Sequence, residues 1–305
     1  MSGQLGTDGG GCTTMLVSVG PALRALSAVA VEIGWVSAHA ATYPLGLLRD
    51  RGDELNPQRF RTDGLPLAQR SLLGTDVEAA TTPIVLIHGI VDNRTVFAML
   101  RRALRKRGFS RIRSFSYGPQ TTDLRAAAER LGEFVENLCE ETGCDRVQVV
   151  GHSLGGLIGR YYVQCLGGAR RVRTLVTLGT PHHGTNAARF VPWPLVQQLR
   201  PDSPVIKELA GPARQCDTRI VAIHSDVDQM IVPPRNARLS HPDLRAENVL
   251  VRGVGHLSLP VNTRIVHLIC TTLADQTALG EISANVPEGE PGMQEQIRVL
   301  RNGLG

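Results

Sequence analysis

The chain has 305 residues, 42% of them hydrophobic, and its 33 basic and 28 acidic residues leave a net charge of +5. A chain of this length can bury one sizeable core, and a single domain of this size is ordinary. The small basic excess falls short of the clustering that a nucleic-acid binder needs, so we expect no nucleic-acid partner.

The first 81 residues divide into three parts by composition. Residues 1–14 carry a glycine run and no apolar pattern, which predicts a disordered N-terminus. Residues 15–48 are apolar and are interrupted only by Arg24 and Glu32. Residues 49–81 are polar and broken by glycine and proline, which predicts a surface connector.

The apolar segment 15–48 allows more than one interpretation. A membrane-spanning helix needs about 20 apolar residues, and the charge-free run here, Ile33 to Leu48, is shorter. The triplet Ala38-His39-Ala40 resembles a signal-peptide cleavage site, although Glu32 interrupts the apolar region that would precede it. We expect an accessory helical segment that packs on the main domain or lies on a membrane surface.

A buried strand is predicted at 82–87, followed by His88-Gly89-Ile90 and then by a helix at 94–107. The helix is rich in arginine, and its apolar residues recur at helical spacing. We interpret it as a helix that covers the sheet and exposes its charged face to solvent. Attraction of that face to anionic lipid is a second interpretation, compatible with the first.

The rest of the body alternates strands with helices and ends near residue 275. The predicted elements are strand 111–116, helix 122–142, strand 146–150, helix 154–166, strand 172–178, strands 218–224 and 247–252, and helix 261–274. This alternation predicts an α/β fold, a mostly parallel sheet with helices on both faces. Residues 180–217 contain Pro192, Pro194, Pro201 and Pro204 with short helical pieces, and residues 276–305 are expected to form a polar tail.

The stretch Gly151-His152-Ser153-Leu154-Gly155-Gly156 directly follows the strand predicted at 146–150. It has the pattern of a nucleophile elbow, in which a serine stands on a strained strand-to-helix turn. A side chain at either flanking position would collide with the neighbouring strand or helix. Gly151 and Gly155 avoid that collision, so we expect Ser153 to be a catalytic nucleophile.

Two further candidates follow later strands, in the order serine, acid, histidine. The strand at 218–224 leads into Ser225-Asp226-Val227-Asp228, and the strand at 247–252 leads into Gly253-Val254-Gly255-His256. Because the carboxyl ends of parallel strands lie along one edge of a sheet, residues 153, 228 and 256 can meet there.

Together these motifs resemble the α/β-hydrolase superfamily, and within it the small bacterial triacylglycerol lipases and esterases. The stretch from Thr177 to Thr185 looks like the strand end and loop that follow the nucleophile helix in many lipases. The resemblance implies an α/β-hydrolase catalytic domain over 82–275 with a cap at 180–217. It also favours Asp228 over Asp226 as the catalytic acid, because Met230-Ile231-Val232-Pro233 follows as in the acid loop of similar lipases.

These residue types explain how a triad would work. A serine hydroxyl is a poor nucleophile at neutral pH and needs an adjacent base. His256 is suited to that role, and a carboxylate would hold its imidazole in the correct tautomer. We expect the backbone amides of Ile90 and Leu154 to form the oxyanion hole, since Leu154 also opens a helix.

No cofactor or metal is expected. The histidines at 88, 152, 182 and 183 cluster near the predicted site, but each stands where similar lipases carry polar loop residues. The six cysteines form no C-x-x-C pair, which favours a reducing compartment, while their even number leaves disulfides open. We therefore expect a cytoplasmic protein, with peripheral membrane contact through 15–48 and 94–107, and leave secretion open.

The sequence thus predicts an enzyme, a serine hydrolase of the lipase or carboxylesterase type that cleaves lipid-like acyl esters through an acyl-serine intermediate. The apolar N-terminal segment, the proline-broken cap and the basic helix favour a lipid-like substrate. An acyltransferase, thioesterase or amidase could use the same triad. A binding protein with a hydrolase fold and no turnover is the alternative from a different class.

Overall fold

The computed structural model describes residues 82–90, 94–118, 120–213 and 216–275. Six strands form one sheet in the order β2-β1-β3-β4-β5-β6, and every pairing is parallel. The strands are β1 (Ile84–Ile87), β2 (Ile112–Phe115), β3 (Val147–His152), β4 (Val172–Leu178), β5 (Arg219–Ser225) and β6 (Ala246–Val251). The α/β fold with a mostly parallel central sheet that the sequence predicts is confirmed.

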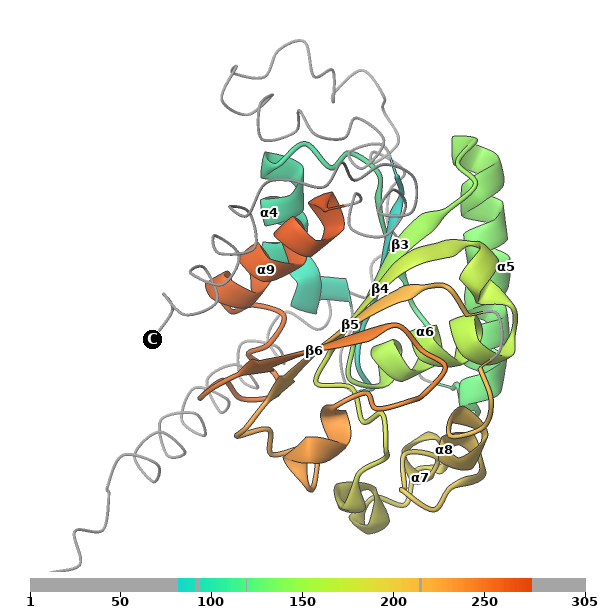
Figure 1. The fold of residues 1–305 in the computed structure, drawn as a ribbon, viewed down its shortest axis with the longest axis vertical. Coiled ribbons are helices and arrows are strands. Elements are labelled where there is room, and N and C mark those ends of the chain that lie inside the picture. Colours follow the sequence, from blue (N-terminus) through green and yellow to red (C-terminus); the bar gives the residue numbers. More distant parts are fainter. Residues whose placement is uncertain (1–81, 91–93, 119, 214–215, 276–305) are drawn as a thin grey trace, which may run out of the picture.

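Helices cover both faces of this sheet (Figure 1). One face carries α4 (Ala98–Lys106) and α9 (Thr263–Ala274), and the other carries α5 (Leu124–Thr142) and α6 (Leu154–Cys165). Shorter pieces are α7 (Pro194–Gln197), α8 (Pro204–Leu209) and the 3₁₀ turns η4 (Arg94–Phe97), η5 (Gly168–Arg170), η6 (Asn186–Phe190) and η7 (Pro234–Ala237). Parallel strands are joined by right-handed crossover connections, and these connections place the helices on both faces of the sheet.

The strands build two cores because successive side chains point to opposite faces. In β1, Val85 and Ile87 belong to the core under α5 and α6, whereas Ile84 and Leu86 belong to the core under α4 and α9. All four residues of β1 are buried, as a strand covered on both faces requires. Each such aliphatic side chain contributes about 1.5–3 kcal/mol when fully buried.

Helix α5 illustrates how the sequence sets the ends of an element. The Asp123 carboxylate accepts a hydrogen bond from Arg125 N at 2.8 Å and caps the first turn. Gly143, in the left-handed region at φ 65°, ends the helix. Between them, buried residues recur every three or four positions and face the sheet. The cap at Asp123 explains why the helix starts at Leu124 and not at the predicted residue 122.

Helix α4 confirms the interpretation of 94–107 as a helix that covers the sheet. Leu100 and Leu104 are fully buried, while the arginine-rich face is exposed or partly exposed. Arg107 donates to His267 Nδ1 on α9 at 2.8 Å, and Arg101 donates to Ser114 Oγ at 3.2 Å. Contact of this face with a membrane stays a prediction.

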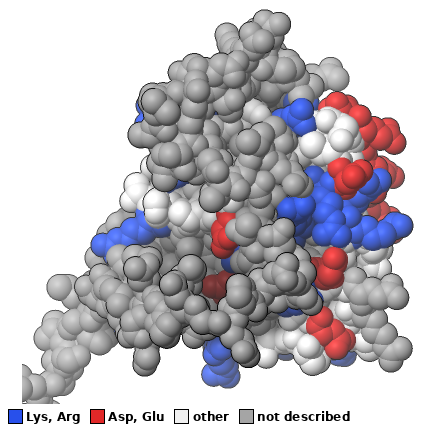
Figure 2. Space-filling model, turned by 45° about the horizontal axis from the view of Figure 1, so that its top comes forward, with Lys and Arg blue, Asp and Glu red and all other residues white. Residues whose placement is uncertain are grey.

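Charges of both signs lie close together on the surface. Figure 2 shows Lys and Arg side chains next to Asp and Glu side chains on one face of the molecule. Examples are the Arg171–Glu136 pair at 2.6 Å and the Arg146–Asp217 pair at 3.3 Å. Such pairs partly cancel each other's electric fields at the surface.

The predictions for residues 1–14, 15–48, 49–81 and 276–305 lie outside the described residues. Within the described part of the chain, none of the helices combines the length and the hydropathy that a membrane span requires. The five cysteines described there, at positions 139, 144, 165, 216 and 270, form no disulfide with one another.

Candidate active site

Ser153 stands at the turn between β3 and α6 in a strained backbone conformation, with φ 52° and ψ −120°. Among the described residues it is the only one other than glycine with a positive φ. Such strain costs on the order of 1–3 kcal/mol and persists only where the surrounding structure imposes it. The predicted strand-to-helix elbow is therefore present, with the serine 8% exposed at its tip.

The glycines around Ser153 allow β3 and α6 to approach each other closely. A Cβ at Gly151 would lie 2.5 Å from the Cα of Gly156, and a Cβ at Gly155 would lie 2.3 Å from the carbonyl oxygen of Ile87. Both positions face backbone that cannot move aside. The expectation that side chains at 151 and 155 would collide with neighbouring elements is confirmed.

Asp228 and His256 form a buried hydrogen-bonded pair. His256 Nδ1 donates to Asp228 Oδ2 at 2.8 Å, and the two residues are 1% and 3% exposed respectively. The other carboxylate oxygen accepts from the backbone N–H groups of Met230 and Ile231, at 2.9 and 3.0 Å. Burial alone raises the pKa of Asp228, but the charge of His256 and these hydrogen bonds outweigh it and leave the pKa below its usual value.

Asp226 lies outside this pair, although it is only two residues away. It is exposed, and its Oδ1 accepts from Gly253 N at 2.8 Å, so that it ties the loop after β5 to the loop after β6. Of the two aspartates that the sequence offered, the structure thus brings Asp228 to His256 and gives Asp226 a role in the turn.

The loop after β4 joins Ser153 to the Asp228–His256 pair. Ser153 N donates to Leu178 O at 2.8 Å, and Thr180 Oγ1 donates to Ser153 O at 3.0 Å. Between these two residues, Gly179 adopts φ +52°, and a Cβ there would lie 3.0 Å from both Asp228 Oδ2 and His256 Nδ1. Residues from β3, β4, β5 and the β6 loop therefore meet at one edge of the sheet.

His152 forms a second link between the elbow and His256. Its ring centroid lies 4.8 Å from that of His256, and its Nε2 donates to His256 O at 3.1 Å. His152 is fully buried and directly precedes Ser153. These contacts hold the loop that carries His256 against the end of β3.

The two backbone amides expected to form an oxyanion hole lie on adjacent elements. Leu154 is the first residue of α6, and amides in a first helical turn have no acceptor within the helix. Ile90 follows β1, whose end packs against Gly155. The loop before Ile90 is held by Tyr117, whose hydroxyl donates to His88 O at 3.1 Å and whose ring stacks on His88.

Burial lowers the pKa of three further histidines, at positions 182, 183 and 224. His182 shares a hydrogen bond with Thr177 Oγ1 at 3.0 Å, and burial lowers its pKa well below the usual value. Burial also lowers the pKa values of His183 and His224. In the described ranges, no three His, Cys, Asp or Glu side chains come together as a metal site would require.

Three residues in this network were not singled out from the sequence. They are Thr180, which contacts Ser153; Gly179, which makes room for the acid–histidine pair; and Arg160, a buried cation on α6. The motif Leu178-Gly179-Thr180 was visible, but its contacts are with residues distant in sequence. An arginine within the otherwise apolar helix 154–163 was the available signal for Arg160.

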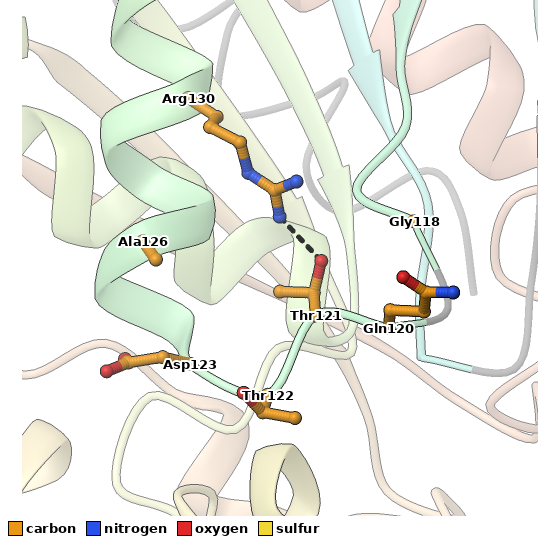
Figure 3. Close-up of a pocket in the computed structure, with 7 residues that line it drawn as sticks. All are labelled: Gly118, Gln120, Thr121, Thr122, Asp123, Ala126 and Arg130. Carbon is orange, nitrogen blue, oxygen red and sulfur yellow. Dashed lines mark hydrogen bonds between the residues drawn. The ribbon is translucent and has the colours of Figure 1, made fainter.

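A pocket of about 510 Å³ opens at the N-terminal end of α5, beside the loop that follows β2. Its lining runs from Gly118 to Arg130, and Arg130 reaches from α5 to the hydroxyl of Thr121 (Figure 3). Ser153, Asp228 and His256 do not line it. The pocket is therefore separate from the acid–histidine pair.

Comparison with known proteins adds a family signal over the central part of the chain. The family model of palmitoyl protein thioesterase matches residues 83–214. A triacylglycerol lipase of Burkholderia plantarii is 29% identical over 132 residues, and one of Pseudarthrobacter phenanthrenivorans is 30% identical over 124 residues. These alignments span 41% and 38% of this chain, and 36% and 38% of the two relatives.

Solved structures support the fold. The mature form of the Bacillus licheniformis lipase BlEst2 superposes with a TM-score of 0.53 at 17% identity, covering 64% of this chain and 92% of that one. Its propeptide form gives a TM-score of 0.51 at 18% identity, covering 69% of this chain and 52% of that one. At this level of identity the likeness concerns the fold.

Proposed function

We propose that the chain is a serine hydrolase of the α/β-hydrolase superfamily, which cleaves carboxylic esters through an acyl-serine intermediate. Ser153 is the nucleophile, His256 the general base and acid, and Asp228 the residue that orients His256. The activity and its substrate belong to this proposal, because the curated lipases are matched over little more than a third of their length.

The observation that carries the proposal is the buried 2.8 Å hydrogen bond from His256 Nδ1 to Asp228. Because Nδ1 keeps its proton for the carboxylate, the lone pair of the imidazole is on Nε2. The low pKa of Asp228 keeps that carboxylate charged, so it stabilises the imidazolium that forms during the reaction.

The reaction then proceeds in two steps. Ser153 Oγ attacks the ester carbonyl carbon while its proton passes to His256 Nε2, and the same proton leaves with the alcohol when the C–O bond breaks. Water next attacks the acyl-serine and gives a proton to His256, which passes it to Ser153 Oγ as the acyl C–O bond breaks and the carboxylic acid leaves. The amides of Leu154 and Ile90 would donate to the oxyanion in both steps, and losing one such donor typically costs about 3 kcal/mol.

An apolar surface close to Asp228 favours a lipid-like ester. Phe190 and Trp193 are 87% and 55% exposed, and Met230 and Val232 are also exposed. Thr185 joins the two segments, since its hydroxyl donates to Met230 O and accepts from Val232 N, each at 2.9 Å. Because Met230 N in turn donates to Asp228 Oδ1 at 2.9 Å, at least the exposed Met230 lies directly beside the proposed acid.

A thioester is the second candidate substrate, favoured by the match to palmitoyl protein thioesterase. The same serine, histidine and oxyanion donors would cleave it, because only the leaving group differs. Paired oxygen-ester and thioester substrates with the same acyl chain separate the two, through the ratio of their kcat/KM values.

The nucleophile is tested with Ser153→Ala. We expect hydrolysis of p-nitrophenyl esters to fall by several orders of magnitude, and a fluorophosphonate probe to label the wild type at Ser153 but not the variant. Ser116→Ala, at an exposed position beyond β2, serves as the control. Labelling elsewhere in the wild type, or retained turnover in Ser153→Ala, contradicts the assignment.

The lipid-like substrate is tested with the double variant Phe190→Ser/Trp193→Ser. We expect its turnover of a long-chain ester presented in vesicles to fall at least about tenfold, while turnover of a soluble short-chain ester stays within about twofold, since the apolar contact is with the lipid. Equal loss on both substrates would argue against a lipid-like ester.

A further inference from the structure

Arg160 is a buried cation in an unusual position. It lies on α6 about two helical turns after Ser153, and it is 1% exposed. It is among the largest fully buried side chains, in a helix whose other buried residues are apolar, glycine or tyrosine. A charge in such surroundings is tolerated only when its N–H groups are well hydrogen-bonded.

The guanidinium donates to three uncharged oxygens. These are Gln164 Oε1 at 3.0 Å, His182 O at 2.9 Å and Leu209 O at 2.7 Å. Burial lowers the pKa of Arg160 to about 10, so the group is still charged at neutral pH. Hydrogen bonds from a charged donor are stronger than those between neutral groups.

The two carbonyl acceptors lie at opposite ends of the segment between β4 and β5. His182 stands near its beginning, and Leu209 stands at the end of α8. Gln164 reinforces the second attachment, because its Nε2 donates to Leu209 O at 3.0 Å and to Gly211 O at 3.3 Å. One side chain on α6 therefore joins both ends of the intervening chain.

The first attachment lies next to the reaction centre. His182 is two residues from Thr180, which donates to Ser153 O, and three from Gly179, where a Cβ would lie 3.0 Å from Asp228 Oδ2 and His256 Nδ1. The intervening chain also carries the exposed Phe190 and Trp193. A shift at the two attachments would thus move both the catalytic loop and the apolar surface beside it.

We propose that Arg160 is a positioning residue that fixes both ends of the stretch from His182 to Leu209 to the helix carrying Ser153, and so sets how a long acyl chain is held. Its effect on substrate rests on the proposed function, whereas its effect on the segment does not. Lysine cannot replace it, because one ammonium group lacks the planar fork that reaches two carbonyls at once.

The first test is hydrogen exchange, measured by mass spectrometry on the full chain carrying Arg160→Lys. We expect peptides covering 180–185 and 205–213 to exchange at least about tenfold faster, because a hydrogen bond from a charged group is lost at each end, while α5 keeps its rate. Arg160→Met removes the charge as well as the hydrogen bonds, and we expect it to speed exchange in the same two peptides.

Two further variants make the test specific. Arg125→Gln removes an exposed ion pair with Glu208 on the same helix α8, and we expect it to leave both peptides unchanged. Gln164→Leu removes the donor to Leu209 and Gly211, and we expect it to speed exchange in 205–213 more than in 180–185. Equal acceleration throughout the molecule, or the same effect from Arg125→Gln, overturns the proposal.

The second test is kinetic. We expect Arg160→Lys to raise KM for a long-acyl ester at least about fivefold more than for a short-acyl one, because the chain that holds the acyl group has lost its attachments. Faster exchange with no such difference in KM would leave Arg160 a purely structural residue and overturn its positioning role. An enzyme without esterase activity would overturn the proposed function, while exchange would still decide whether Arg160 holds the segment.

Discussion

At the scale of single residues, the contacts join positions that lie far apart in the sequence. Asp228 and His256 follow strand ends, and the parallel sheet brings them within 2.8 Å of each other. Thr180 and Arg160 could not be predicted in the same way, because each acts through backbone oxygens that only the folded chain brings within reach. Residue type carries no information about such acceptors.

The two neighbouring aspartates make a sharp comparison. We expect Asp228→Asn to lower kcat by about 10⁴-fold, as an amide favours the wrong imidazole tautomer. Asp226→Asn keeps an oxygen for Gly253 N, so we expect a change below about threefold. The rate of ester hydrolysis at saturating substrate gives kcat for both variants. A larger loss of kcat in Asp226→Asn than in Asp228→Asn would mean that Asp226 is the catalytic acid.

At the scale of elements, hydrophobic periodicity placed every described strand and the longer helices, with ends that differ by at most two residues except at the start of α4. There the predicted first turn, Arg94–Phe97, is a 3₁₀ helix and the α-helix begins at Ala98. The shifts have local causes. The helix predicted from 261 begins at Thr263, since the Asn262 side chain accepts from Arg264 N and Ile265 N and caps it. The strand predicted to end at 150 runs on to His152, because Gly151 pairs with both β1 and β4.

Contact between β3 and α6 can be tested through its glycines. We expect Gly151→Ala to lower the free energy of unfolding by about 1–3 kcal/mol, because the new methyl group would meet the backbone of Gly156. Activity should also fall about 10²-fold as Ser153 is displaced. Urea unfolding and ester hydrolysis measure these effects.

Gly118 is the matched control, since nothing lies within 4 Å of a Cβ built there. We expect Gly118→Ala to change stability by less than about 0.5 kcal/mol. Similar stability of the two variants would mean that β3 and α6 are not in the close contact described.

At the scale of the whole molecule, the sequence predicted a mostly parallel sheet but not the order of its strands. The order β2-β1-β3 requires the chain to return past its first strand, and no local pattern marks that step. The pairing depends on which strands bury the most apolar surface together, as in β1, which lies between β2 and β3. Overall topology is thus a property of the folded chain.

Buried neutral histidines make the whole fold sensitive to acid. Burial, with Arg160 and other histidines nearby, lowers the pKa of His182, so the folded state excludes a proton that the unfolded state binds below about pH 6.5. Stability should therefore fall as pH drops from 7 to 5, by about 1.4 kcal/mol per pH unit for one excluded proton. His183 and His224 act in the same direction.

Urea unfolding of His182→Gln across this range measures that contribution. We expect a shallower dependence on pH than in the wild type, because glutamine takes up no proton in either state. Identical slopes for the two proteins would show that His182 is protonated equally in the folded and unfolded chains.

The order of the strands also places the proposed catalytic residues on different parts of the sheet. The proposed nucleophile Ser153 follows β3 at the centre of the sheet, and the proposed acid and base, Asp228 and His256, follow β5 and β6 on one flank. The loop after β1, on the other side of β3, carries the proposed oxyanion donor Ile90 and is held by Tyr117. A change in that loop would therefore alter the stabilisation of the oxyanion and leave the hydrogen bond between His256 and Asp228 in place.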